Sequence, residues 1–171
     1  MKLVLSPDDI ARRTAELGAA ITRDYAGRRL VVIGILKGAF IFTADLVRAI
    51  DLPLEIDFIR VASYGSQTSS GDLQLTKDVE LELAGKDLLL VEDIVDTGRT
   101  LASLQELLGR RQPRSVRVCA LIDKRERREV EVAIDYIGFA VAEGFLVGYG
   151  LDVAEQHRHH PAVYRLEDAD V

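Results

Sequence analysis

Short apolar runs recur along this chain, and segments with helical spacing lie between them. Most of the runs have the length of a strand and are largely apolar, and a run without polar residues, such as 30–36, is typical of a strand buried on both faces of a sheet. The predicted strands cover residues 30–36, 54–62, 87–95 and 117–122. The segment 79–83 alternates apolar and acidic residues, a pattern that predicts an edge or hairpin strand.

The first helix is predicted from its start signal. Ser6 supplies a capping hydroxyl, Pro7 suits the first helical position, and two acids follow near the positive end of the helix dipole. Gly27 is expected to end this helix. Its inward face is predicted from the spacing of Ile10, Thr14, Leu17 and Ile21. Two further helices are predicted at 40–50 and 100–111.

The alternation of strands and helices predicts an α/β fold, with a parallel twisted sheet flanked by helices on both faces. No repeat, low-complexity tract or linker interrupts the pattern, so residues 1–171 are expected to form a single domain. The polar segment 63–77 interrupts the alternation of strands and helices. A long connection without regular structure is usually either a functional lid or disordered, and we favour the lid. Ligands of such folds bind beyond the carboxyl ends of the strands.

Charge and composition narrow the possible partners. The chain has 22 basic and 28 acidic residues and a net charge of −6, which argues against nucleic acid as the main partner. Charged residues interrupt every apolar run well short of the roughly 20 residues that a bilayer span requires, so we expect no membrane partner. The amino terminus turns acidic too early for a secretory signal. The single cysteine, Cys119, excludes an internal disulfide, fits a reducing cytoplasm and reads as a core residue.

One segment, VEDIVDTGRT at 91–100, contains a pattern suited to phosphate binding. It leaves a buried strand and turns into the next helix, where backbone N–H groups and the helix dipole attract anions. Gly98 lets the backbone approach a ligand closely, and the hydroxyl groups of Thr97 and Thr100 can donate hydrogen bonds. The turn is therefore a candidate cradle for a phosphate monoester.

Three carboxylates precede or begin this cradle: Glu92, Asp93 and Asp96. They suit a ligand that carries hydroxyl groups and a bound cation, because carboxylates accept hydrogen bonds from ribose hydroxyls and hold the hydrated Mg²⁺ ion. Ribose, phosphate and magnesium together indicate a phosphorylated pentose. Strand-end acids with Asp96 as a helix cap remain an alternative for the residues taken singly. The segment lacks the glycine spacing and the lysine of a nucleotide P-loop, and its acids are spaced differently from those of aspartyl phosphatases.

The segment resembles the phosphoribosyl pyrophosphate signature of type I phosphoribosyltransferases, and Asp96 before Thr97-Gly98 resembles their hypoxanthine-guanine branch. The resemblance covers nearly the whole chain. Its motifs, in order, are ILKGAF at 35–40, SYG at 63–65, the signature at 91–100, DKR at 123–125 and FLVGYGLDVAEQHR at 145–158. It implies a small hood and a flexible lid loop over the sheet, and a homodimer or homotetramer.

The resemblance also assigns roles to individual residues. The sugar-phosphate site would comprise Glu92, Asp93, Asp96, Thr97, Gly98, Arg99 and Thr100. The pyrophosphate site would comprise Lys37, Gly38 and Arg158, with a non-proline cis peptide before the lysine. Mg²⁺ would be bound by Asp152, together with Glu92 and Asp93.

At the base end, the resemblance places Lys124 at the purine 6-oxo group, Phe145 against the ring and the backbone of Leu146 along its edge. Ser63 and Tyr64 would belong to the lid. The base-binding assignments stand against simpler interpretations, since an isolated phenylalanine is more often a core residue.

The implied reaction transfers the 5-phosphoribosyl group from phosphoribosyl pyrophosphate to hypoxanthine or guanine, giving IMP or GMP and pyrophosphate in purine salvage. Asp96 is the predicted general base, or the acceptor that orients purine N7. A nucleotide sensor that regulates RNA, and a transferase for xanthine or adenine, remain alternatives. The preference among hypoxanthine, guanine and xanthine stays open, as do the roles of His157, His159 and His160.

Overall fold

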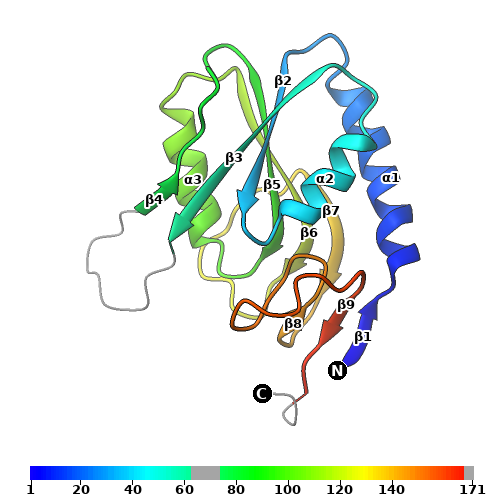
Figure 1. Ribbon diagram of the computed structural model, residues 1–171. Helices are drawn as coiled ribbons and strands as arrows, with labels where there is room; N and C mark the ends of the chain where they lie inside the picture. Colours follow the sequence, from blue (N-terminus) through cyan, green and yellow to red (C-terminus); the bar gives the residue numbers. More distant parts are fainter. Residues whose placement is uncertain (63–73, 168–171) are drawn as a thin grey trace.

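The computed structural model describes residues 1–62 and 74–167, and its centre is a twisted six-stranded sheet (Figure 1). The strand order is β4-β3-β2-β5-β6-β7, in which only β4 runs antiparallel to its neighbour. The bounds are β2 (Leu30–Leu36), β3 (Leu54–Ala62), β4 (Gln74–Lys77), β5 (Asp87–Val95), β6 (Ser115–Lys124) and β7 (Tyr136–Val141). The predicted α/β class and its four predicted strands are confirmed, although only two residues of β3, Asp57 and Ile59, are buried.

Helices cover both faces of this sheet, as predicted. They are α1 (Pro7–Asp24), α2 (Phe40–Arg48) and α3 (Arg99–Gly109). Along β5, Leu89 and Val91 pack in the core beneath α1 and α2, whereas Leu88 and Leu90 pack in the core beneath α3. Successive side chains of a strand point to opposite faces, so a continuous apolar run can fill both cores.

The start of α1 follows the predicted capping signal. The Ser6 hydroxyl accepts a hydrogen bond from the Asp9 backbone N–H at 3.1 Å, and the Asp9 carboxylate bonds back to Ser6. A cap of this kind contributes about 1 kcal/mol. It fixes the position at which the chain enters α1.

A second sheet lies beyond the carboxyl ends of the main strands (Figure 1). Its order is β1-β9-β8, with strands β1 (Lys2–Leu5), β8 (Leu146–Val147) and β9 (Val163–Arg165). We call this sheet and the loop 148–160 the hood. Its strands and β7 were not predicted from the sequence.

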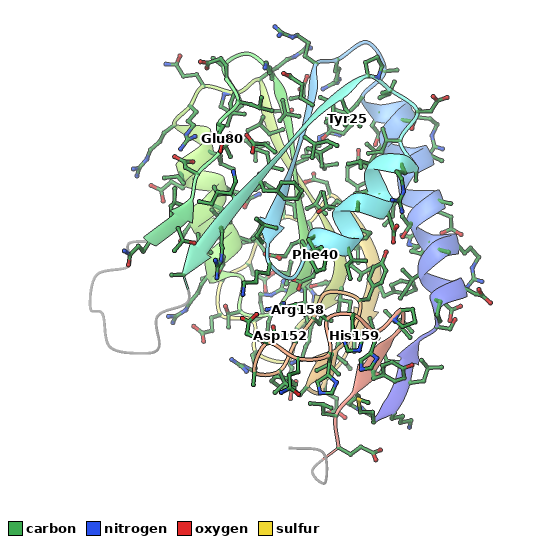
Figure 2. All side chains as sticks on the ribbon, viewed as in Figure 1. Tyr25, Phe40, Glu80, Asp152, Arg158 and His159 are labelled. Atoms are coloured by element: carbon green, nitrogen blue, oxygen red, sulfur yellow. The ribbon has the colours of Figure 1, made fainter. Side chains whose placement is uncertain are left out.

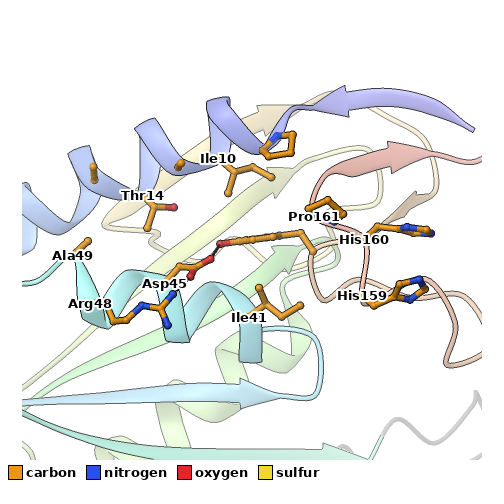
Figure 3. A pocket seen from close by; sticks show the side chains of 13 residues that line it. Ile10, Thr14, Ile41, Asp45, Arg48, Ala49, His159, His160 and Pro161 are labelled. Atoms are coloured by element: carbon orange, nitrogen blue, oxygen red, sulfur yellow. Dashed lines mark hydrogen bonds and ion pairs between the residues drawn. The ribbon is translucent and has the colours of Figure 1, made fainter.

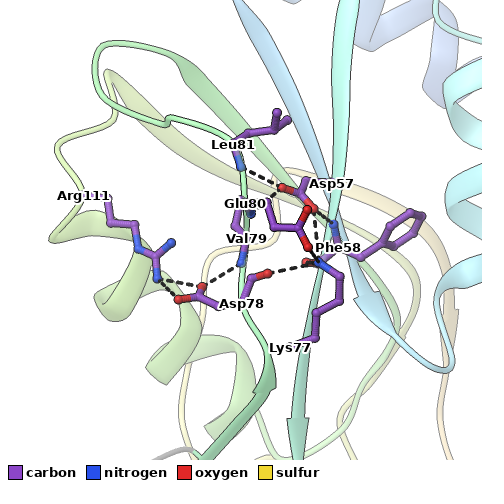
Figure 4. Close-up of polar contacts among 8 residues, drawn as sticks. All are labelled: Asp57, Phe58, Lys77, Asp78, Val79, Glu80, Leu81 and Arg111. Atoms are coloured by element: carbon purple, nitrogen blue, oxygen red, sulfur yellow. Dashed lines mark hydrogen bonds and ion pairs between the residues drawn. The ribbon is translucent and has the colours of Figure 1, made fainter.

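One predicted strand is wrong. Residues 79–83 form no strand; the antiparallel edge strand is β4, which precedes them. The Asp57 carboxylate accepts hydrogen bonds from the backbone N–H groups of Glu80 at 2.8 Å and Leu81 at 3.0 Å (Figure 4). These N–H groups bond to a side chain instead of a neighbouring strand, while Val79 and Leu83 are buried. The alternation therefore marks an anchored loop.

The predicted lid at 63–77 overlaps this region. Its last four residues form β4, and the predicted lid residues Ser63 and Tyr64 lie outside the described residues. Within the described ranges, none of the helices has the length and apolar character needed to cross a membrane.

Candidate active site

The site lies where the connections from two neighbouring parallel strands diverge. The chain leaves β2 through α2 toward β3, and it leaves β5 through α3 toward β6, on the other side. Such a divergence opens a crevice at the carboxyl ends of the strands. Here a Cβ atom on Gly38 would lie 1.8 Å from Asp93 Oδ2, and one on Gly150 would lie 1.9 Å from the Gly38 carbonyl oxygen. Only glycine lets the two loops and Asp93 approach this closely.

The predicted pyrophosphate residues meet in this crevice. The peptide bond between Leu36 and Lys37 is cis, as the resemblance implied. Arg158 donates to the Gly150 carbonyl at 2.7 Å and forms an ion pair with Asp152 at 2.9 Å. Figure 2 shows Asp152 and Arg158 beside each other in the hood.

The cleft around these groups has a volume of about 270 Å³. It brings together all the residues predicted for pyrophosphate and metal: Lys37, Gly38, Glu92, Asp93, Asp152 and Arg158. Two more charged residues, Arg60 and Glu155, line it as well and were not predicted. Arg60 lies near the carboxyl end of β3, so its position in a predicted strand is the signal that could have found it.

Glu92 and Asp93 are buried side by side at the carboxyl end of β5. Burial, followed by the negative charge of Asp93, raises the pKa of Glu92 well above its ordinary value. Burial also raises the pKa of Asp93. A site that holds two carboxylates out of water favours a bound cation, because the cation compensates their charge.

These residues fit Mg²⁺ by the chemistry of their donor atoms. Mg²⁺ prefers oxygen ligands and usually combines one or two carboxylates with water and substrate phosphates. Within 1–62 and 74–167, no group of three or more His, Cys, Asp or Glu side chains is arranged to hold a metal ion. A magnesium ion at Glu92, Asp93 and Asp152 would therefore need oxygen atoms from water or from a phosphorylated ligand.

The predicted phosphate cradle forms a small pocket of about 170 Å³ at the start of α3. Gly98 precedes the helix with a φ of 82°, a left-handed conformation that favours glycine. A Cβ atom there would lie 2.2 Å from the Val130 carbonyl oxygen. Thr97 and Thr100 line the pocket, whereas the Arg99 side chain forms an ion pair with Glu129. The turn that begins α3 therefore lines the pocket, and the start of a helix suits an anion.

The segment 128–130 supports the cradle from behind. Arg128 donates from Nε to the Asp96 carbonyl at 2.9 Å and from Nη2 to the Val95 carbonyl at 3.1 Å. The Thr97 carbonyl accepts from the backbone N–H groups of Glu129 at 2.9 Å and Val130 at 3.0 Å. The Arg128 side chain is only 5% exposed, and it binds the cradle backbone.

Of the predicted base-binding residues, Lys124 lies beside the cradle residue Asp96. Lys124 ends β6, is buried, and places Nζ 4.0 Å from Asp96 Oδ2 and 3.2 Å from Glu126 Oε2. The other oxygen of Asp96, Oδ1, is buried with no hydrogen-bond partner among the described residues. Phe145 is 53% exposed, which suits a surface for stacking, and Leu146 is buried in β8.

The three histidines form a separate cluster in the hood. His157 Nδ1 and His160 Nε2 lie 3.2 Å apart, and the rings of His159 and His160 lie next to each other at a tilt.

An apolar groove of about 530 Å³ lies between α1 and α2 (Figure 3). Within this groove, the Tyr149 hydroxyl donates a hydrogen bond to Asp45. The groove contains none of the predicted site residues, and its apolar lining does not suit a phosphorylated ligand.

Comparison with known proteins agrees with this geometry. Residues 5–154 match the family model described as the phosphoribosyl transferase domain. The hypoxanthine phosphoribosyltransferase of Salmonella typhimurium is 43% identical over 97% of this chain and 95% of its own length. The hypoxanthine-guanine phosphoribosyltransferase of Aquifex aeolicus is 45% identical over 98% and 96%.

Solved structures give the same result. A hypoxanthine phosphoribosyltransferase from Staphylococcus aureus superposes with a TM-score of 0.94 at 41% identity, covering 98% of this chain and 92% of that one. A hypoxanthine-guanine phosphoribosyltransferase from Bacillus anthracis superposes with a TM-score of 0.93 at 39% identity, covering 98% and 99%.

Proposed function

This chain belongs to the phosphoribosyl transferase family, and from that premise we propose that it transfers the 5-phosphoribosyl group of phosphoribosyl pyrophosphate to a 6-oxopurine. The base is hypoxanthine, guanine or both, and the products are IMP or GMP and pyrophosphate. The observation that supports this reaction best is the 4.0 Å approach of Lys124 Nζ to Asp96 Oδ2 beside the phosphate cradle. A 6-oxopurine presents an acceptor at O6 and a donor at protonated N7 on one edge, which matches a cation and a carboxylate held side by side. The RNA-regulating alternative loses support, because the similar proteins named above are enzymes.

The chain's own groups divide the reaction among them. The cradle at Thr97, Gly98 and Thr100 binds the 5′-phosphate, and Glu92 with Asp93 accepts hydrogen bonds from the ribose hydroxyls. When the bond between C1′ and the pyrophosphate breaks, an oxocarbenium-like sugar remains, as in glycoside hydrolysis, and a ring nitrogen of the purine then bonds to C1′.

One pair of charged residues then acts on the purine base, and another acts on the departing pyrophosphate. Asp96 takes the proton from the purine nitrogen or orients the base through N7, and Lys124 donates to the 6-oxo group. Lys37 and Arg158 bind the departing pyrophosphate. The chemistry that Mg²⁺ supplies when bound is neutralisation of the leaving group's charge. Asp152, Glu92 and Asp93 are the residues that would hold it.

The setting of the reaction is also part of the proposal. Cys119 is buried, and burial raises the pKa of its thiol, so it is an inert thiol that fits a cytoplasmic enzyme. Residues 1–171 act as one domain. Phe40 and Ile56, which are 44% and 45% exposed, are large apolar side chains that suit a homodimer or homotetramer.

Product analysis tests the proposed reaction. The full-length protein is incubated with phosphoribosyl pyrophosphate, Mg²⁺ and either hypoxanthine or guanine, and the products are separated by chromatography and identified by mass. We expect IMP or GMP and pyrophosphate in equal amounts, and no turnover when Mg²⁺ is removed by a chelator. Failure to form a nucleotide from either base, with correctly folded protein, would contradict the proposal.

A further inference from the structure

Glu155 lies between the two cations assigned to pyrophosphate. Its Oε2 atom is 2.8 Å from Lys37 Nζ, and its Oε1 atom is 3.4 Å from Arg158 Nη2. The two oxygens of one carboxylate therefore bridge the loop after β2 and the hood. The side chain is 62% exposed, so solvent and ligands reach it freely.

The backbone holds this carboxylate in position. Ala154 and Glu155 have φ angles of 49° and 65°, a left-handed conformation that is uncommon for residues other than glycine. The Glu155 backbone N–H donates to Asp152 Oδ2 at 2.9 Å, and Val153 and Gln156 pair across the turn. Unfavourable backbone conformations persist where the surrounding structure enforces them, and they concentrate at functional sites. The turn thus joins Glu155 directly to the predicted metal ligand Asp152.

We propose that the Glu155 carboxylate occupies the pyrophosphate subsite of the ligand-free chain and is displaced when a pyrophosphate group binds. The inference rests on the function proposed for this cleft. A carboxylate and a phosphate oxygen satisfy the same donors on Lys37 and Arg158, so they compete for them. Exposed ion pairs are individually weak, and a pyrophosphate group with several charges displaces one carboxylate.

The exchange affects both the binding of the substrate and the release of pyrophosphate. Glu155 holds Lys37 and Arg158 together before the substrate arrives, and it lowers the net affinity of the subsite for pyrophosphate. After transfer, the same carboxylate returns to the two cations as the product leaves. Glu155 is therefore a positioning residue that favours release of pyrophosphate over tight retention.

Calorimetric titration of the full-length protein with inorganic pyrophosphate and Mg²⁺ tests this exchange. We expect Glu155→Gln to bind pyrophosphate about three- to tenfold more tightly than the unmodified chain, the range expected from losing two weak competing ion pairs. Glu155→Ala should show the same direction. The matched control is Glu16→Gln, which removes the same charge from an exposed pair, Arg13–Glu16 at 2.8 Å on α1, and should leave the affinity unchanged.

Steady-state kinetics supply the second readout. For Glu155→Gln, the KM for phosphoribosyl pyrophosphate and the inhibition constant of pyrophosphate should fall together, while the KM for hypoxanthine stays constant. Unchanged or weaker pyrophosphate binding in both Glu155 variants would overturn the exchange, even in an active enzyme. An inactive chain that still shows the affinity contrast would instead contradict the proposed reaction and leave the exchange supported.

Discussion

Asp96 and Lys124 come from separate segments, yet their charged groups lie 4.0 Å apart at the edge of the phosphate cradle. Asp96 Oδ1 is buried and has no partner among residues 1–62 and 74–167. A buried polar atom without a hydrogen bond costs about 1–3 kcal/mol. Such an atom is accounted for when a ligand donates to it, which is the role that a protonated purine nitrogen would fill.

Replacing this carboxylate by its amide tests its role in proton transfer. Asp96→Asn keeps the size of the side chain but removes its ability to accept a proton. We expect kcat to fall by about 10²–10⁴-fold, with little change in the affinity for phosphoribosyl pyrophosphate. Steady-state kinetics and equilibrium binding separate the two quantities. Asp51→Asn, at an exposed position between α2 and β3, is the control. Turnover close to the unmodified enzyme would show that another group accepts the proton.

The raised pKa of Glu92 makes a prediction about stability and pH. A carboxyl whose pKa is higher in the folded chain than in the unfolded chain costs no stability below its unfolded pKa, because both states are then protonated. The cost grows as pH rises and is complete above the folded pKa. Without divalent cations, Glu92→Gln should therefore melt at a higher temperature than the unmodified chain at pH 7.5, and the difference should shrink at pH 5.

Thermal unfolding at the two pH values, in the presence of a chelator, measures this difference. The Gln carbonyl can still accept the hydrogen bond that Glu92 receives from the Asp93 backbone N–H at 3.1 Å, so the local structure should persist. If the variant is less stable at pH 7.5, or if the difference does not depend on pH, the ionised Glu92 carboxylate does not destabilise the folded chain.

At the level of elements, the site depends on how α3 begins. Gly98 provides the left-handed turn before the helix, and the segment 128–130 packs against it through the Val130 carbonyl. The buried Arg128 ties the same segment to the ends of β5 and β6. The phosphate cradle is thus a joint product of one helix start and a distant loop.

Gly98→Ala should distort this joint. A left-handed backbone costs a residue with a Cβ about 1–2 kcal/mol, and the new atom would also lie 2.2 Å from the Val130 oxygen. We expect the affinity for phosphoribosyl pyrophosphate to weaken by about tenfold, equivalent to about 1.4 kcal/mol. Gly109→Ala is the control in the same helix, because nothing lies within 4 Å of its Cβ position. Equal ligand affinity in the two variants would contradict the role given to this turn.

For the molecule as a whole, the sequence predicted what is encoded locally. The strands β2, β3 and β5 have the predicted bounds, because segments rich in apolar residues mark them directly along the chain. The signature residues were found because they lie within one ten-residue segment. Contacts between distant segments were missed. Lys37 and Glu155 are 118 residues apart in the chain, and Arg128 lies 32 residues from Asp96.

The same reason explains the one wrong strand and the hood. Residues 79–83 alternate like a strand, but their backbone is bonded by Asp57, 23 residues away from Glu80. The hood strands have two to four residues, so their apolar pattern is too short to distinguish from a loop. Their pairing joins the two ends of the described chain, which no local pattern shows.

The most direct measurement is a comparison of kcat/KM for hypoxanthine and adenine, with one enzyme preparation and saturating phosphoribosyl pyrophosphate and Mg²⁺. A buried Lys124 that donates to the 6-oxo group cannot donate to the 6-amino group of adenine, so the charge would be left unpaired. Sites built around such a hydrogen bond reject the wrong partner by about 10⁴-fold. We therefore predict formation of IMP and a kcat/KM for adenine lower by about this factor. Comparable values for the two bases would contradict the assignment of this chain as a 6-oxopurine phosphoribosyltransferase.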